Sequence, residues 1–144
     1  MQKASNTSHF QTIWQLYQQT MFYWGNSVPT FDEFAIITAY NPEGKIITPN
    51  GNKKRHKKLL TKVKLSGWSY AALTGCNNDY SHQEHGLAIS LEIKEAVNLA
   101  IEFDQNAIYY VSNNHLTLHP CLLDGPEVVA LGSFSSRLIS RDSG

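Results

Sequence analysis

The chain has 144 residues, of which 42% are hydrophobic and 11% aromatic, and its 12 basic side chains balance its 12 acidic ones. This size and composition fit one globular domain and exclude collagen-like or intrinsically disordered chains. Because the net charge is zero, it indicates no class of partner.

Cysteine content and the amino-terminal residues indicate the compartment. Cys76 and Cys121 are too few for a disulfide framework, so we expect reduced thiols. Residues 1–8 are polar and lack the basic and apolar stretches of a signal peptide. No apolar run approaches the roughly 20 residues needed to cross a bilayer. We therefore expect a cytoplasmic protein without membrane contact, folded as a single domain over residues 1–144 and frayed at residues 140–144.

Three segments open the chain. Residues 9–19 place apolar side chains at helical spacing, which predicts a short amphipathic helix. Residues 20–24 are rich in aromatic side chains and predict a strand. Residues 35–40 (AIITAY) form a short apolar run that is typical of a central strand, and Asn41 with Pro42 ends it.

From Asn52 the apolar side chains recur with a helical period. Leu59 and Val63 fall on one face, and lysines occupy most of the remaining positions. Asn52 is the expected N-cap, and Gly67 stands where a C-terminal cap glycine belongs. The pattern predicts a helix over residues 52–66.

The rest of the chain is predicted to alternate strands with one more helix. The segments are a strand at 68–74, a polar loop at 75–85, a strand at 87–91, a helix at 94–104, a strand at 107–111, a turn at 113–114, a strand at 116–118 and a short strand at 128–131.

The order of elements between residues 35 and 111 is strand, helix, strand, strand, helix, strand. This is the split βαβ arrangement of ferredoxin-like folds, an antiparallel sheet with both helices on one face. We therefore predict an α+β protein with a ferredoxin-like βαββαβ core, to which an amino-terminal helix and strand and a carboxy-terminal hairpin are added. A three-layer α/β fold is the alternative.

In the predicted topology, polar residues from four segments meet at one end of the sheet. A helix N-terminus attracts anions, and side-chain amides can orient a polar ligand. We therefore predict a site for a small polar or anionic ligand; the alternative is that these side chains only tie loops together. The expected ligand-binding residues are Asn41, Asn52, Lys53, Arg55, Gln105 and Asn106.

Catalysis is left open by the sequence. If the protein is an enzyme, Glu84 is the expected acid–base residue, with His85 as the fallback. The spacings of cysteine and histidine match no standard zinc pattern, and neither a P-loop nor a dinucleotide-binding glycine motif is present. We expect neither a metal site nor a cofactor.

Seven of the 12 basic residues lie between residues 53 and 64, without an acidic residue among them. Such a run is usually a solvated helix face. It also favours an alternative function, in which the helix at 52–66 binds nucleic acid or an acidic protein.

Several short motifs carry a resemblance to a known family. The motifs are T-A-x-N-P at residues 38–42, Asn52 with Arg55 at the head of a helix, Glu84 two residues ahead of an apolar strand, Q-N-A at residues 105–107, and Tyr17 with Thr20 as an amino-terminal Y-x-x-T. With these motifs, the chain resembles the bacterial family "domain of unknown function 3293" over roughly residues 14–120. The resemblance implies no activity, because that family has none assigned.

Two features depart from the pattern of this family. Gly86 stands where a serine is usual, and the segment between residues 25 and 34 is shorter than usual. The first departure removes a hydroxyl group from the Glu-x-Ser element.

Overall fold

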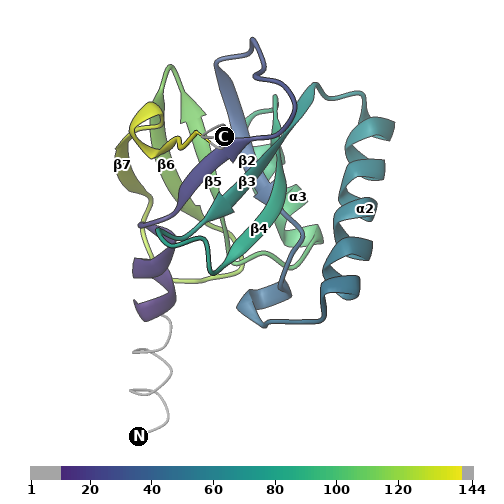
Figure 1. Cartoon of the computed structure of the whole chain (residues 1–144), viewed down its shortest axis with the longest axis horizontal. Helices are drawn as coiled ribbons and strands as arrows, with labels where there is room; N and C mark the ends of the chain where they lie inside the picture. The colour runs from purple at the N-terminus through teal and green to yellow at the C-terminus, as the bar shows by residue number, and fades with distance from the viewer. Residues whose placement is uncertain (1–10, 141–144) are drawn as a thin grey trace, which may run out of the picture.

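The computed structural model describes residues 11–140 (Figure 1). Residues 11–17 are helical. The predicted helical residues 9 and 10 and the predicted frayed residues 141–144 lie outside the described part. The elements that follow are β1 (Met21–Trp24), β2 (Glu33–Thr38), the short helix η1 (Pro42–Gly44), α2 (Pro49–Ser66), β3 (Tyr70–Cys76), β4 (Gln83–Ile89), α3 (Ile93–Glu102), β5 (Ala107–Ser112), β6 (His115–Pro120), β7 (Val129–Ser133) and the short helix η2 (Ser135–Arg137).

All seven strands belong to one sheet, in the order β1-β3-β4-β2-β5-β6-β7, and every neighbouring pair is antiparallel. The chain passes through α2 between β2 and β3, and through α3 between β4 and β5. The predicted α+β class with an antiparallel sheet is therefore confirmed. The sheet also continues beyond the four predicted core strands, with β1 at one edge and β6 and β7 at the other. The assignment to ferredoxin-like folds stays a prediction.

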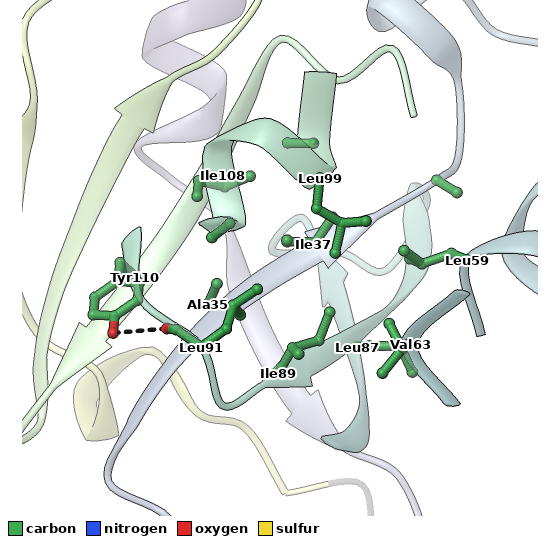
Figure 2. Packing of buried hydrophobic residues seen from close by; sticks show 13 residues of the cluster. Ala35, Ile37, Leu59, Val63, Leu87, Ile89, Leu91, Leu99, Ile108 and Tyr110 are labelled. Atoms are coloured by element: carbon green, nitrogen blue, oxygen red, sulfur yellow. Dashed lines mark hydrogen bonds between the residues drawn. The ribbon is translucent and has the colours of Figure 1, made fainter. Parts of the chain in front are cut away.

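Both helices pack on the same face of the sheet. Alternate side chains of β2, among them Ala35 and Ile37, form one buried cluster with Leu59 of α2 and Leu99 of α3 (Figure 2). Burial of each such leucine stabilises the fold by about 1.5–3 kcal/mol. Tyr110 closes this core at its edge, where its hydroxyl donates to the Leu91 carbonyl at 3.0 Å.

The other face of the sheet curls around a second core. The rings of Phe22, Trp24 and Phe34 surround Phe134, with centroids 5.4–5.8 Å from it. The curl brings the residues after β7 back to β1, because the amide of Ile139 donates to the Phe22 carbonyl at 2.8 Å. This face is therefore concave, and aromatic side chains fill one end of it.

Helix α2 begins three residues before the predicted start. Thr48 is the N-cap, and its hydroxyl oxygen accepts a hydrogen bond from the Gly51 amide at 3.1 Å. The prediction that Asn52 caps this helix is wrong, because Pro49 already has the backbone angle of a first helical residue. Gly67 ends the helix in the left-handed conformation, as predicted.

The predicted polar loop at residues 75–85 is shorter than expected. Residues Gly75 and Cys76 continue β3, and Gln83 to His85 already pair with them in β4. Strand side chains alternate between the two faces, so Glu84 and His85 point to opposite sides of the sheet. The sequence did not reveal this part of β4, because its residues are polar on both faces of the sheet at the start of the strand.

Gly86 allows β2 and β4 to approach closely. A Cβ atom at this position would lie 2.7 Å from the backbone oxygen of Ile37. We predict that Gly86→Ala lowers the free energy of unfolding by about 1–3 kcal/mol, since backbone rather than a side chain must move. Gly75→Ala is the matched control, because its nearest contact is a side-chain methyl of Thr20 at 3.3 Å. Urea denaturation compares the two variants, and equal losses would contradict the argument.

Candidate functional site

A cavity of about 580 Å³ opens on the concave face of the sheet, beyond the aromatic core. Its floor consists mostly of alternate residues of six strands, and its walls come from the helical residues 11–17 and the connecting segments around them. The strand residues that line it are Phe22 of β1, Ile36 and Thr38 of β2, Leu73, Gly75 and Cys76 of β3, Glu84 and Gly86 of β4, Ala107 and Tyr109 of β5, and Leu118 of β6.

Glu84 is the carboxylate of the cavity floor. Its Oε2 atom accepts a hydrogen bond from Asn41 Nδ2 at 2.9 Å and lies 3.2 Å from His82 Nε2. The hydrogen bond to Glu84 raises the pKa of His82, and partial burial opposes this shift. Glu84 Oε1 has no hydrogen-bond partner among residues 11–140.

Asn41 owes its position to Asn52. The Asn41 amide donates to Asn52 Oδ1 at 2.8 Å, and Asn52 Nδ2 donates to Asn41 Oδ1 at 3.0 Å. Both side chains are buried. Asn41 has a left-handed backbone (φ 48°), which asparagine tolerates better than most residues. Asn52 therefore lies behind the cavity wall and orients Asn41, whose free amide group then points to Glu84.

The predicted basic contacts lie elsewhere. Arg55 Nε donates to the Ala39 carbonyl at 2.6 Å, its guanidinium also donates to the Phe103 carbonyl, and its Nη2 atom lies 3.5 Å from Asp104 Oδ2. Arg55 thus ties the end of β2 to the end of α3. Lys53 is exposed on α2. Neither residue lines the cavity.

Gln105 and Asn106 line the cavity, as their sequence position suggested. Both are more than nine-tenths buried. Gln105 Nε2 donates to the carbonyls of Tyr40 and Phe103, both at 3.1 Å, which fixes the orientation of this amide. Asn106 Nδ2 donates to the Tyr17 hydroxyl at 3.2 Å.

The sequence did not assign Tyr109 to the site. Its buried hydroxyl lies 2.5 Å from the Tyr17 carbonyl oxygen and 2.8 Å from Thr20 Oγ1. Burial raises the pKa of Tyr109 far above its ordinary value, so the hydroxyl keeps its proton. Arg137 adds hydrogen bonds to the carbonyls of Gln18 and Thr20 at 2.7 and 3.1 Å. These contacts hold residues 11–17 beside the cavity.

His85 points away from the cavity. Its Nδ1 atom lies 2.8 Å from Thr74 Oγ1, and its ring packs edge-on against Tyr40 with centroids 5.7 Å apart. His56 lies against the same Tyr40 ring, and its Nδ1 is buried without a partner. Glu84 and His85 therefore cannot act together on one ligand, and the histidine that contacts Glu84 is His82.

Within residues 11–140, no group of three or more histidine, cysteine, aspartate or glutamate side chains is placed to hold a metal ion. In the same part of the chain, no helix is both long and apolar enough to cross a membrane.

The lysines of α2 stay on the solvent side of that helix, away from the cavity lining. Lys62 lies 3.7 Å from Glu102 of α3, an exposed ion pair that contributes little to stability. The alternative of a nucleic-acid or acidic-protein surface on this helix stays a prediction.

Residues 37–108, half of the chain, match the family model described as "Protein of unknown function (DUF3293)". The chain belongs to this family. No curated protein and no solved structure matches the chain. The DUF3293 segment runs from β2 to β5, so it contains both helices and the cavity residues Thr38, Asn41, Glu84 and Gln105. Tyr17 and Thr20, which complete the wall, precede it.

Replacement of Asn52 tests the support of the cavity wall. Asn52→Ala should lower the free energy of unfolding by about 1–3 kcal/mol per hydrogen-bonding group of Asn41 that is left unpaired. Asn50→Ala, in the exposed first turn of the same helix, is the matched control and should change it by less than about 0.5 kcal/mol. Chemical denaturation measures both, and equal effects would contradict the role assigned to Asn52.

Two histidines should change stability with pH in opposite directions. Burial, with a smaller contribution from His85, lowers the pKa of His56 from 6.5. Its unfolded form binds the proton more readily, so stability decreases as the pH falls below about 6.5. The pKa of His82 is raised, so its contribution is complete below about 6.5 and is lost as the pH rises.

We therefore expect His56→Gln to lose less unfolding free energy than the wild type between pH 7.5 and pH 5.5, and His82→Gln to lose more. Denaturation curves at the two pH values measure the difference. Identical pH dependence of the unfolding free energy in the two variants would contradict the opposite pKa shifts assigned to His56 and His82.

Proposed function

We propose that the protein binds a small polar ligand in the concave-face cavity, with Glu84 as the central contact. One observation carries the proposal: the cavity gathers the motif residues Tyr17, Thr38, Asn41, Glu84 and Gln105 from separate segments. Its volume of about 580 Å³ falls in the range of small-molecule sites.

The hydrogen bonds of these residues also support a binding role. Asn41 and Gln105 are oriented by buried contacts before any ligand arrives, which lowers the entropic cost of binding. These contacts also leave two acceptor atoms over, because Glu84 Oε1 and Gln105 Oε1 lack a partner within the described residues.

If the ligand is turned over, Glu84 is the acid–base group and His82 is its partner in proton transfer. The two side chains are within hydrogen-bond distance, at 3.2 Å, and both line the cavity. Glu84→Gln would then abolish turnover while the melting temperature holds.

Thermal-shift screening of small metabolite-like compounds tests the proposal. A ligand present at 100 times its Kd adds about 2.7 kcal/mol to the free energy of unfolding. We expect at least one compound to stabilise the wild type and to lose this effect in Ala107→Leu, which extends a side chain into the cavity. Ala130→Leu makes the same change on an exposed position of β7 and should respond like the wild type.

Two results would count against a cavity ligand. One is a library in which no compound stabilises the wild type. The other is an equal response of Ala107→Leu and Ala130→Leu. Binding of generic RNA or DNA that decreases with salt and is lost in a Lys57→Glu, Lys58→Glu variant would instead favour the surface of α2.

A further inference from the structure

We infer that the ligand is an organic ammonium with an apolar body, whose charged group is held by Glu84 and whose N–H groups also reach the Gln105 side-chain oxygen. This inference rests on the proposed function and names the class of ligand for the same cavity.

The charges of the cavity lining favour a cation. Among residues 11–140, its acidic side chains are Glu84 and Asp79, and its only histidine is His82. No lysine or arginine is among the described lining residues, and Arg55 is committed to backbone carbonyls elsewhere. A partly enclosed carboxylate attracts a cation more strongly than an exposed one does, and it repels an anion. The anionic ligand expected from the sequence would therefore meet repulsion here.

The unused hydrogen-bonding atoms favour a donor-rich ligand. Gln105 Nε2 already donates to two carbonyls, so its Oε1 is the atom left over. Glu84 uses Oε2 for both of its contacts, which leaves Oε1. Both oxygens are open to solvent at least in part. In the described part of the chain, the one fully buried side-chain nitrogen or oxygen atom without a hydrogen-bond partner is His56 Nδ1, so an unpaired oxygen of Glu84 or Gln105 is not fully buried. A ligand therefore finds two acceptors, and an ammonium group supplies three donors.

Both acceptors belong to residues that line the cavity near the end of β2. Glu84 contacts Asn41, and Gln105 donates to the carbonyl of Tyr40, the preceding residue. Burial raises the pKa of Tyr17, and the hydrogen bond from Asn106 partly opposes this shift. The negative charge of Glu84 raises the pKa of Tyr17 further, so Glu84 lies close to this phenol. Both side chains therefore approach the end of β2, and the inference places the cationic group between their free oxygens.

The rim of the cavity favours an apolar body rather than a bare ion. Ile13, Leu16 and Ile46 lie among the lining residues, and Leu16 and Ile46 are 59% and 81% exposed. An alkyl or arylalkyl chain would cover these side chains. A metal ion would gain nothing from them, and the described side chains offer no group of three metal ligands.

His82 makes binding of an ammonium dependent on pH. Its imidazole faces Glu84, and Asp79 lies in the same loop. The protonated ring neutralises Glu84 and competes with the ligand, so ammonium binding should strengthen as the pH rises through the pKa of His82. The proton on His82 is then released as the ammonium binds.

Three probes of equal chain length test the inference by calorimetry: n-hexylammonium, 1-hexanol and hexanoate. We expect n-hexylammonium to bind the wild type at least about tenfold more tightly than the other two, with the preference larger at pH 8 than at pH 6. Glu84→Gln should remove the preference, while the matched variant Glu127→Gln, on an exposed loop, keeps it.

The outcomes separate the inference from the proposed function. The wild type could bind all three probes equally, and Ala107→Leu could abolish this binding. That result would contradict the inference that the ligand is an ammonium, and it would still support the cavity as a binding site. Tighter binding of hexanoate would also overturn it. Failure of every probe and of every library compound would contradict the proposed function itself. The comparison of probes needs only the wild type, so it stands even if Glu84→Gln is unstable.

Discussion

The reciprocal pair of Asn41 and Asn52 is the interaction on which the site depends. It joins the end of β2 to the first turns of α2 by two hydrogen bonds between buried groups, at 2.8 and 3.0 Å. An unpaired buried amide costs about 1–3 kcal/mol, so each side chain requires the other. Asn41 consequently presents one amide nitrogen to Glu84, and the carboxylate keeps one oxygen for the cavity.

The two faces of the sheet differ in composition and in packing. The face under α2 and α3 is apolar and gives the fold its larger core. The concave face is aromatic at one end, around Phe134, and polar at the other, around Glu84. Because the curl closes over the aromatic end, only the polar end is left open. The proposed ligand would reach the floor residues between the helical residues 11–17 and the loops.

The sequence predicted the order of elements well, because the helical and strand periods are strong where one face is buried. Leu59 and Val63 marked α2, and both are fully buried. The turn at Asn113 and Asn114 is also confirmed, since both residues have positive φ angles that asparagine tolerates. Of the residues expected to converge, Asn41, Glu84, Gln105 and Asn106 line the cavity, whereas Asn52, Arg55 and His85 do not.

The remaining differences arise where the local sequence reveals neither the direction of a side chain nor its distant partners. Glu84 and His85 are adjacent in sequence, yet they lie on opposite faces of β4. Arg55 was expected to contact a ligand, but its donors bind backbone carbonyls that no sequence pattern reveals. Tyr109 depends on a contact with Thr20, 89 residues away, for which local pattern gives no signal.

The location of the bound probe tests the account most directly. Amide ¹H–¹⁵N spectra recorded during a titration with n-hexylammonium report which residues sense it. The account predicts progressive shifts at Gly75, Gly86 and Gln105, which surround the cavity, and none at Lys57 or Lys58 on the exposed side of α2. Shifts confined to α2, or shifts around Gly67 and Gly125 in place of the cavity residues, would contradict it.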